Sequence, residues 1–312
     1  ICAKMTTKRY FDYPLFMKSF FNERVQKISV HAGLTCPNRD GTKGTGGCTF
    51  CNNESFSPKY CQSEKSITQQ IEEGIEFFGK KHQAQKYIAY FQSYTNTYGD
   101  FNRIKEMYEE ALKYPNMIGL AIGTRPDCIS EEILDYLSEL NKKYFILVEY
   151  GIESTNNDTL RSINRGHTYE DSIAAILGTH KKGILVAGHI IMGLPNENRD
   201  LILGHAKRIA KLPLSLLKLH QLQVIKGTQL AKQYAQDNSI IQLLSLDEYI
   251  DLCIDFMELL PPTMAIERFV SQTPAEFKIA PNWGVKNHEF TAKIDKRLKE
   301  RDTFQGKLYI AE

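Results

Sequence analysis

The sequence predicts an α/β fold, a partial (β/α)6 barrel followed by a small C-terminal helical extension. Between about residue 25 and residue 236, short apolar runs alternate with segments of helical periodicity. Six such units follow one another, and their strands are apolar almost throughout, which is typical of parallel sheets covered by helices. A closed barrel of this kind needs about eight units, so the pattern favours an open or partial barrel.

Each predicted unit pairs one apolar run with one amphipathic segment. The expected strands are 25–33, 86–94, 117–125, 144–154, 184–195 and 214–224. The expected helices are 66–82, 101–114, 130–143, 168–183, 199–212 and 228–236. Ser66 and Gln69 stand at capping-box spacing, which supports the start of the first helix.

The pattern changes after about residue 240. Residues 244–260 form one amphipathic segment that ends at a Pro-Pro pair, 264–272 are a candidate strand, and 284–302 predict a charged surface helix. We therefore expect a barrel domain over residues 1–240, with a glycine-rich loop at 33–60, and an extension over residues 241–312 that packs on the barrel.

The composition is that of a globular protein. The chain has 312 residues, of which 42% are hydrophobic and 24% charged, and its formal net charge is +2. This balance argues against purely electrostatic binding to nucleic acid or to an anionic membrane. There is no run of about eighteen apolar residues, and residues 1–18 lack the apolar block of a secretion signal, so no membrane segment is expected.

Three of the seven cysteines gather in one loop, and the other four are scattered along the chain. The odd count is not that of a disulfide framework and fits a reducing cytoplasm. Cys36, Cys48 and Cys51 lie in LTCPNRDGTKGTGGCTFCNN (34–53), whose glycines allow the backbone to approach whatever the sulfur atoms hold.

These three thiols are open to several interpretations. Structural zinc needs four ligands, and the fourth would be Cys61 or His31, because the chain has no second Cys-x2-Cys pair. A thioredoxin-like redox pair is disfavoured because CTFC does not open a helix, and GTKGTGG lacks the ending of a phosphate-binding loop. We favour an iron–sulfur cluster on three thiolates, which leaves one iron with an open position, over zinc or inert thiols.

Three cysteines after a first strand, the last two flanking an aromatic residue, resemble the radical S-adenosylmethionine superfamily. The usual spacing there is Cys-x3-Cys-x2-Cys, whereas eleven residues separate Cys36 from Cys48 here. A longer first gap marks the branch that includes the Elongator catalytic subunit. Other stretches that resemble this branch are TRPD (124–127), NRGHT (164–168), HIIMGLP (189–195) and LQVIKGT (222–228). The stretches closest to the bacterial YhcC-like group are CPNRDGTKGTGGCTFC (36–51) and YFQSYTNTYG (90–99).

The resemblance, which covers roughly residues 20 to 300, implies a radical enzyme. In this superfamily the open iron of a 4Fe-4S cluster chelates S-adenosyl-L-methionine. An electron from the cluster then breaks the sulfur–C5′ bond, and the resulting 5′-deoxyadenosyl radical abstracts hydrogen from a substrate. Cys36, Cys48 and Cys51 carry over as the cluster ligands, and a flavodoxin or ferredoxin is implied as electron donor. The protein would supply orientation and exclude competing reactions.

The resemblance also implies contacts to S-adenosylmethionine around the cluster. Phe50 would pack near the adenine, unless it is a plain core aromatic. Gln92, Tyr94 and Asn96 are expected to alternate to one face beyond the second strand, near the methionine amino group. Arg165 matches an arginine that pairs with the methionine carboxylate, although an exposed arginine at a helix start is the bland alternative.

Further candidates lie on the fourth to sixth strands. Glu149 and Glu153 are expected to share a face with Gly151 and to bind ribose hydroxyls, or else to form salt bridges with an arginine, Arg125 or Arg165. Gly193 would let the backbone approach the adenosine. Further along, the edge at 224–225 is expected to offer hydrogen bonds to adenine.

Two histidines are the candidates for catalysis. His189 stands where some relatives carry a cofactor-facing aspartate, so it is open to a ribose contact, proton transfer or a place in the core. His220 is expected to face the substrate. In TRPD, Arg125 and Asp127 flank a proline, and a structural role in a turn is expected for them.

The substrate cannot be read from the sequence. Resemblance to the Elongator branch suggests transfer RNA, and the basic segment 286–301 is a candidate phosphate contact, but no nucleic-acid module is evident. The alternative function is a non-catalytic zinc or iron–sulfur protein for binding or electron transfer. Such a protein would not need polar residues of several strand ends aimed at one rim.

Overall fold

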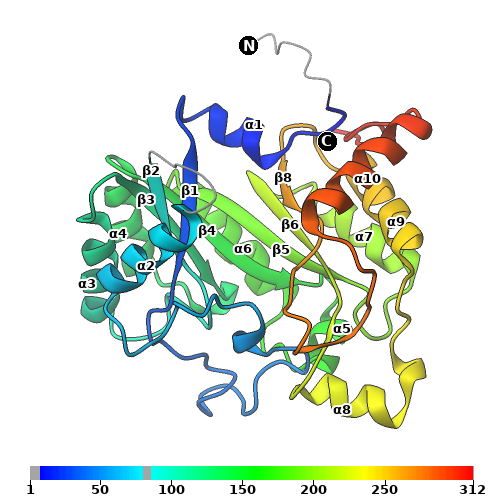
Figure 1. Ribbon diagram of the computed structural model, residues 1–312, viewed down its shortest axis with the longest axis horizontal. Coiled ribbons are helices and arrows are strands. Elements are labelled where there is room, and N and C mark those ends of the chain that lie inside the picture. Colours follow the sequence, from blue (N-terminus) through cyan, green and yellow to red (C-terminus); the bar gives the residue numbers. More distant parts are fainter. Residues whose placement is uncertain (1–7, 80–85, 312) are drawn as a thin grey trace.

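The computed structural model describes residues 8–79 and 86–311. Its centre is a curved sheet of seven parallel strands in the order β1-β2-β3-β4-β5-β6-β8 (Figure 1). The strands of this sheet are β1 (Val25–Val30), β2 (Lys86–Phe91), β3 (Met117–Thr124), β4 (Phe145–Glu153), β5 (Leu185–Met192), β6 (Leu216–Gln221) and β8 (Ala265–Arg268). Two short antiparallel strands, β7 (Val224–Ile225) and β9 (Lys278–Ala280), form a second sheet.

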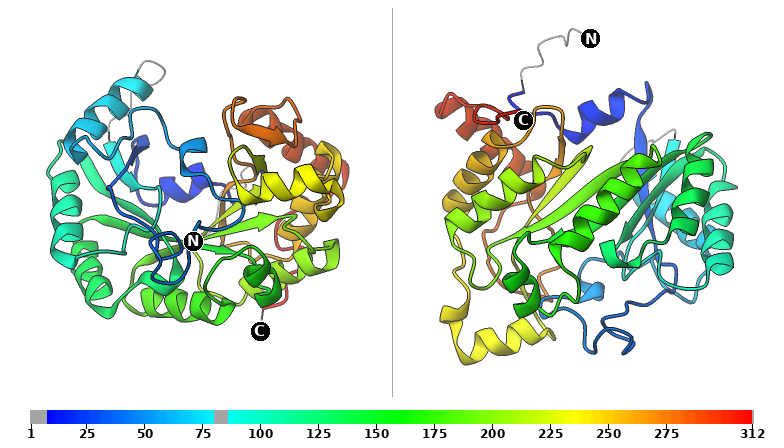
Figure 2. Two further views of the ribbon diagram at one scale, coloured as in Figure 1. Left: turned by 90° about the horizontal axis from the view of Figure 1, so that it is seen from below. Right: turned by 180° about the vertical axis from the view of Figure 1, so that it is seen from behind.

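Helices cover the outer, convex face of the curved sheet (Figure 2). They are α2 (Ile67–Gly79), α3 (Phe101–Leu112), α4 (Glu131–Asn141), α6 (Tyr169–Lys181), α7 (Arg199–Ile209) and α9 (Leu246–Glu258). The helices α5 (Asn157–Ser162) and α8 (Gln229–Gln236) lie at the carboxyl ends of the strands, and α10 (Asn287–Glu300) packs on α9 (Figure 1). Local sequence explains where many of them begin, because a polar side chain accepts a backbone N–H at the start. Ser130 caps α4, Thr168 and Asp171 form a full capping box for α6, and Ser66 accepts the N–H of Gln69 at α2.

The predicted partial barrel is confirmed, with one more strand than the six repeating units. The additional strand, β8, comes from the candidate strand 264–272 and pairs with β6 in parallel. It follows α9, so the segment after residue 240 contributes a strand–helix unit to the same sheet.

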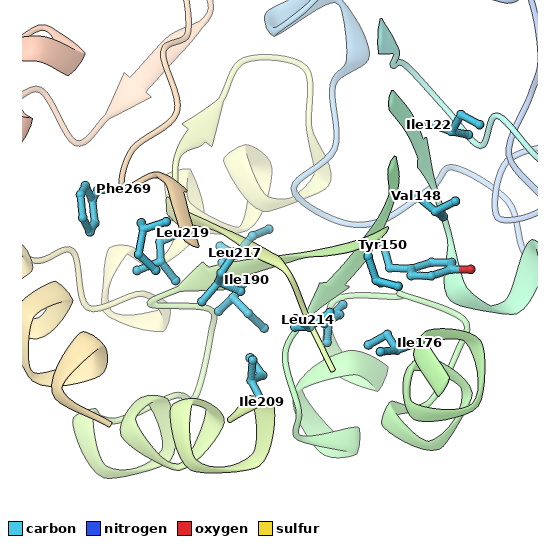
Figure 3. Packing of buried hydrophobic residues seen from close by; sticks show 14 of the residues in the cluster. Ile122, Val148, Tyr150, Ile176, Ile190, Ile209, Leu214, Leu217, Leu219 and Phe269 are labelled. Atoms are coloured by element: carbon cyan, nitrogen blue, oxygen red, sulfur yellow. The ribbon is translucent and has the colours of Figure 1, made fainter. Parts of the chain in front are cut away.

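The main hydrophobic core fills the layer between the sheet and the outer helices. Ile190, Leu217 and Leu219 point from the strands toward Ile209 of α7, and Tyr150 lies beside Ile176 of α6 (Figure 3). All of these side chains belong to strands or helices that the apolar periodicity predicted. Successive side chains of a strand point to opposite faces of the sheet, so the apolar side chains of one face are covered by the outer helices.

The concave face of the sheet, called the lumen here, is closed at one end by α1 (Tyr13–Lys18). Phe16 and Met17 pack there against Phe145, Leu147 and other apolar side chains near the amino ends of the strands. Asp12 caps α1 and pairs with Ile266 beside β8. Because this end is filled, polar chemistry in the lumen faces the opposite, carboxyl end of the strands.

The C-terminal helix differs from the surface helix that the sequence predicted. Phe290, Ile294 and Leu298 of α10 are fully buried, so one face of this helix packs into the core. Arg297 and Arg301 are not free for phosphate, since both form ion pairs with acidic residues of α9. Among the residues that the structure describes, no helix is long and apolar enough to cross a membrane.

Candidate active site

The loop at residues 33–60, called the cysteine loop here, follows β1 and lies at the end of the molecule opposite α1 (Figure 1). Backbone hydrogen bonds join it to two distant segments. The N–H of Thr49 donates to the carbonyl of Ile163 (3.0 Å), and the N–H of Leu230 donates to the carbonyl of Thr49 (2.8 Å). The loop is therefore held between the end of α5 and the start of α8.

Asn38 explains why glycines are needed around the loop. Its amide donates to the carbonyl of Asn164, and the amide of Asn164 in turn donates to the carbonyl of Gly47 (2.9 Å). A Cβ atom on Gly44 or on Gly166 would come within 2.8 Å of Asn38 Oδ1. Gly166 also has φ +76, so both space and conformation require glycine in NRGHT.

Arginines surround the three thiols. Arg165 Nη1 lies 3.6 Å from Cys48 Sγ, and Arg39 donates to the carbonyl of Cys51 (3.0 Å). Although burial opposes it, the charges of Cys51 and Cys36 raise the pKa of Arg39 above its ordinary value. Burial and the neighbouring Cys48 raise the pKa of Cys51 to about 11. Two thiolates so close together repel each other, and bound metal would relieve that repulsion.

TRPD has the structural role that the sequence predicted. Arg125 forms two hydrogen bonds to Asp127, both of 2.9 Å, and donates to the carbonyl of Arg165 (2.8 Å). Burial opposes ionisation of Asp127, but Arg125 and Lys43 hold the pKa of its carboxyl well below the ordinary value. This buried pair fixes the backbone that carries Arg165.

Arg165 joins the cysteine loop to the fourth strand. Besides Cys48, it contacts the carbonyl of Gly151 (2.6 Å), His167 Nε2 (2.9 Å) and Glu153 (3.6 Å). The residue is 7% exposed, so it is not the exposed arginine of the alternative interpretation. A bulge between Gly151 and Glu153 gives Glu153 a φ of 66° and brings its carboxylate to this arginine.

The expected alternation of Gln92, Tyr94 and Asn96 is wrong. Strand β2 ends at Phe91, and Ser93 and Tyr94 both adopt left-handed conformations, so the period of two is lost. Asn96 is fully buried and its amide donates to three backbone carbonyls, while its Oδ1 has no partner among the described residues. Tyr94 is 37% exposed and packs against His31 and Arg39, and Gln92 donates to Ser29.

Glu149 does not pair with Arg125 or Arg165, as one alternative expected. It lies in the lumen in a ring of four charges with Lys27, Lys218 and Glu267. Lys27 lies 2.9 Å from Glu149 and 2.8 Å from Glu267, and Lys218 contacts both carboxylates as well. Burial opposes ionisation of Glu149, yet Lys218 and Lys27 hold its pKa well below the ordinary value. Burial lowers the pKa of Lys218 to about 8.

His189 and His220 lie together in the lumen, with ring centroids 5.4 Å apart. His189 Nε2 is 3.1 Å from Glu149, and His220 Nδ1 contacts the hydroxyl of Ser271. Burial, and then Lys218, lower the pKa of His189 to about 4. Burial and Arg268 lower that of His220 well below its ordinary value. Both rings are therefore neutral near pH 7 and able to accept a proton or donate a hydrogen bond.

The remaining predicted residues follow the carboxyl ends of strands, as the cysteine loop does. Phe50 is partly buried against the core, and Gly193 has φ +90 in the turn after β5. The edge at 224–225 is strand β7, and on one side it pairs with β9.

Because buried histidines stay neutral in the folded chain, we expect the free energy of unfolding to fall as the pH is lowered. The pKa of His189 is lowered to about 4 and that of His167 to about 3, mainly by burial, whereas the pKa of a histidine in the unfolded chain is about 6.5. Below about pH 6.5 these histidines bind protons in the unfolded chain but stay unprotonated in the folded chain. The free energy of unfolding therefore falls as the pH drops toward about 4.5. The expected slope is up to about 1.4 kcal/mol per pH unit for each such histidine.

Urea unfolding at about pH 7, 6 and 5 measures this slope. The variant His189→Gln keeps a donor for Glu149 and should have a shallower slope than the natural chain. Paired carboxylates such as Asp127 contribute only at lower pH, because their pKa values are lowered from about 3.8. Equal stability of the natural chain at all three pH values would contradict the prediction.

Sequence reasoning missed the ring partners Lys27, Lys218 and Glu267. A signal was present, because Lys218 interrupts the apolar run of LSLLKLHQLQV at a position that faces away from the helices. A lysine in a strand buried on both faces indicates a buried anion nearby. The identity of that anion requires the fold, since Glu149 lies 69 residues earlier in the chain.

The candidates for a fourth zinc ligand are engaged elsewhere. Cys61 donates to the carbonyl of Ser29 (3.1 Å), and His31 Nδ1 accepts the N–H of Gly33 (2.9 Å). Within residues 8–79 and 86–311, no three His, Cys, Asp or Glu side chains converge closely enough to hold one metal ion. A single zinc ion requires ligands within about 2.3 Å, whereas the thiolates of a cubane cluster bind different irons.

Comparisons with known proteins identify the family of the chain. A model of the radical SAM superfamily matches residues 39–209, and a model of the radical SAM C-terminal domain matches residues 214–300. The uncharacterized protein YtqA of Bacillus subtilis is 36% identical over 97% of this chain and 94% of its own length. The protein YhcC of Escherichia coli is 32% identical over 90% of this chain and 89% of its own.

Two more distant matches are an archaeal Elp3 and a tRNA uridine(34) acetyltransferase. The solved structure of an archaeal Elp3 from Methanocaldococcus infernus has a TM-score of 0.69 at 18% identity and covers 90% of this chain, which shows a shared fold. This chain spans only 64% of that structure. A tRNA uridine(34) acetyltransferase of the same organism is 30% identical over 38% of this chain and 22% of its own length.

Proposed function

The chain belongs to the radical SAM superfamily of enzymes, and from this premise we propose that Cys36, Cys48 and Cys51 hold a 4Fe-4S cluster that binds and cleaves S-adenosylmethionine. The observation that carries the proposal is the set of three thiols in one loop that is lined by Arg39 and Arg165 and fixed by Asn38. The positive charges of the two arginines offset the negative charge of three thiolates. When bound, the cluster would supply the electron that breaks the sulfur–C5′ bond.

The residues of the chain would bind the cofactor and keep water out. Arg165 presents a guanidinium fork beside Cys48 that suits the methionine carboxylate. Asn96 Oδ1, a buried acceptor without a described partner, and the backbone at Ser93 and Tyr94 lie beyond β2, where the amino group is expected. Burial raises the pKa of Glu153, although the charge of Arg165 opposes this shift. Glu153 would bind a ribose hydroxyl, and Phe50 would pack on the adenine.

His189 and His220 are the groups suited to handle protons of the substrate. Both are neutral, and His220 Nε2 is buried without a described partner. Glu149 fixes the Nε2 side of His189, and Ser271 fixes the Nδ1 side of His220. In this role the rings would hold or move a proton at the free nitrogen while hydrogen abstraction takes place in the lumen.

Arg165 is expected to act on cofactor binding more than on folding. Arg165→Lys keeps the charge but cannot bridge Cys48, Gly151 and His167 at once. We expect the iron content after reconstitution, or the apparent affinity for S-adenosylmethionine, to fall by about 10- to 100-fold. Iron analysis and equilibrium binding of S-adenosylmethionine measure the two effects separately. An unchanged affinity with full iron content would contradict the proposed contact.

Transfer RNA is the substrate that the relatives suggest. The tRNA uridine(34) acetyltransferase is 30% identical to this chain over 120 residues, which supports modification of a tRNA base. A flavodoxin or ferredoxin is proposed as electron donor. The six described cysteines are free thiols, which fits a reducing cytoplasm as the place of action.

An anaerobic assay tests the proposed function against the alternative of a non-catalytic metal protein. The full chain is reconstituted with iron and sulfide, reduced with dithionite and supplied with S-adenosylmethionine. Formation of 5′-deoxyadenosine in proportion to enzyme supports the radical enzyme. Tight zinc binding with no 5′-deoxyadenosine would favour the alternative.

A further inference from the structure

Arg268 carries a charge that the lumen does not balance. In the ring, the two lysines Lys27 and Lys218 face the two carboxylates Glu149 and Glu267, so these charges cancel. Arg268 is opposite Lys218 in the sheet, and its side chain has no hydrogen bond or ion pair to any residue in 8–79 or 86–311, while its Nε is buried. A partly buried cation of this kind is costly unless an anion joins it.

A β-bulge turns Arg268 toward the lumen. In the pairing of β6 with β8, Leu217 is opposite Ile266 but Lys218 is opposite Arg268, so Glu267 is skipped. Residues opposite each other in a sheet point to the same face, and Lys218 points into the lumen, where it meets Glu149. The bulge therefore places Glu267 and Arg268 on the same side of the strand.

A cavity of about 240 Å³ lies at the open edge of the barrel next to β8. Its lining includes Tyr10, Tyr13, Glu267, Arg268 and Asn287. Tyr13 also lies under Lys27, with the ammonium 4.9 Å from its ring centroid, so the cavity borders the charge ring. The carboxylate of Glu267 is already neutralised by the two lysines, and Lys8 and Asp12 of the lining pair with each other at 2.6 Å. Among the described residues of this wall, Arg268 is therefore the cation without an ion pair.

The same arginine acts on the two candidate histidines. Its charge contributes to the lowered pKa of His220 and, less strongly, of His189. His220 is also influenced by His189, Lys218 and Glu149. Lys218 is opposite Arg268, and His220 lies two residues further along β6 on the same face, so Arg268 connects the cavity with the place where the reacting atoms are expected.

We propose that the substrate carries a carboxylate or phosphate group that binds in this cavity against the guanidinium of Arg268, with its reacting part directed to His189 and His220. The inference rests on the proposed function, because it names the chemical class of that enzyme's substrate. A guanidinium forms two parallel hydrogen bonds with either oxyanion, and the excess positive charge of the wall is cancelled when the anion is bound.

A titration followed by NMR tests this anion site. The full chain, labelled with 13C in histidine, is titrated at about pH 6 with inorganic phosphate, with acetate and with glycerol as the neutral control. The His220 signal is identified by its absence in His220→Gln. A bound anion screens Arg268, so the His220 ring takes up protons more easily, and its signal should shift with saturation for phosphate or acetate but not for glycerol.

Two variants decide whether Arg268 is the cause. Arg268→Gln should lose the saturable shift, with affinity at least about tenfold weaker, while Arg268→Lys should retain it at lower affinity, because the charge remains but the guanidinium fork is lost. Preference for phosphate or for acetate tells which oxyanion the site takes. Absence of a saturable shift in the natural chain, or an equal response in Arg268→Gln, would overturn the proposal. The titration contains neither S-adenosylmethionine nor reductant, so its failure is separate from failure of the cleavage assay.

Discussion

Replacing any one of Cys36, Cys48 and Cys51 by alanine should abolish formation of 5′-deoxyadenosine and remove the four-iron cluster. Cubane clusters are normally held by four thiolates, and with three the loss of one more leaves two ligands. We expect cleavage to fall to background, at least about 10³-fold below the natural chain, in each of the three variants. Iron and sulfide analysis after anaerobic reconstitution and the 5′-deoxyadenosine assay measure the two losses.

Cys61→Ala is the matched control for this series. Its thiol donates to the carbonyl of Ser29 in β1, so its removal loses one hydrogen bond, worth about 1 kcal/mol. The control should keep its iron and its cleavage. Retention of cleavage in Cys36→Ala, or its loss in Cys61→Ala, would show that the ligand set is wrong.

The second large effect is expected from Glu149→Ala, which breaks the charge ring in the lumen. Lys218, 1% exposed, would lose its closest carboxylate, and Lys27 would keep only Glu267. Removing one partner of a buried ion pair costs about 3–5 kcal/mol, because the other charge is left buried and uncompensated. Urea unfolding at neutral pH measures the loss of free energy of unfolding.

A double variant shows that charge balance, and not lost packing, is responsible. Glu149→Gln leaves two lysines with one carboxylate, whereas Glu149→Gln with Lys218→Met leaves one of each. The double variant should recover more than half of the loss, since a balanced or apolar replacement of a buried pair is often close to neutral. Additive destabilisation by the two changes would contradict this explanation.

Local signals in the sequence were sufficient for the fold because strands and helices follow from periodicity and capping. The strand β8 was harder to assign, as its four residues include Glu267 and Arg268, which a bulge turns to the lumen. The helix α10 was taken for a surface helix because its charges dominate the pattern. Phe290, Ile294 and Leu298, spaced by four residues, nevertheless form a buried stripe.

Several features of the site depend on tertiary structure. The contact of Arg165 with Glu153 was foreseen as an alternative, because NRGHT and the end of β4 are close in sequence. The partners of Glu149 come from β1, β5 and β6, and only the curvature of the sheet brings Lys27 of β1 to it. The alternation beyond β2 failed because Ser93 and Tyr94 are left-handed, which neither residue type indicates by itself.

Electron paramagnetic resonance of the reduced, reconstituted chain tests the central claim most directly. If Cys36, Cys48 and Cys51 hold a 4Fe-4S cluster with an open iron, reduction gives a four-iron signal that changes when S-adenosylmethionine is added, because the cofactor binds to the cluster itself. A four-iron signal that is the same with and without S-adenosylmethionine, or the absence of any such signal in a protein that holds zinc, would contradict the account.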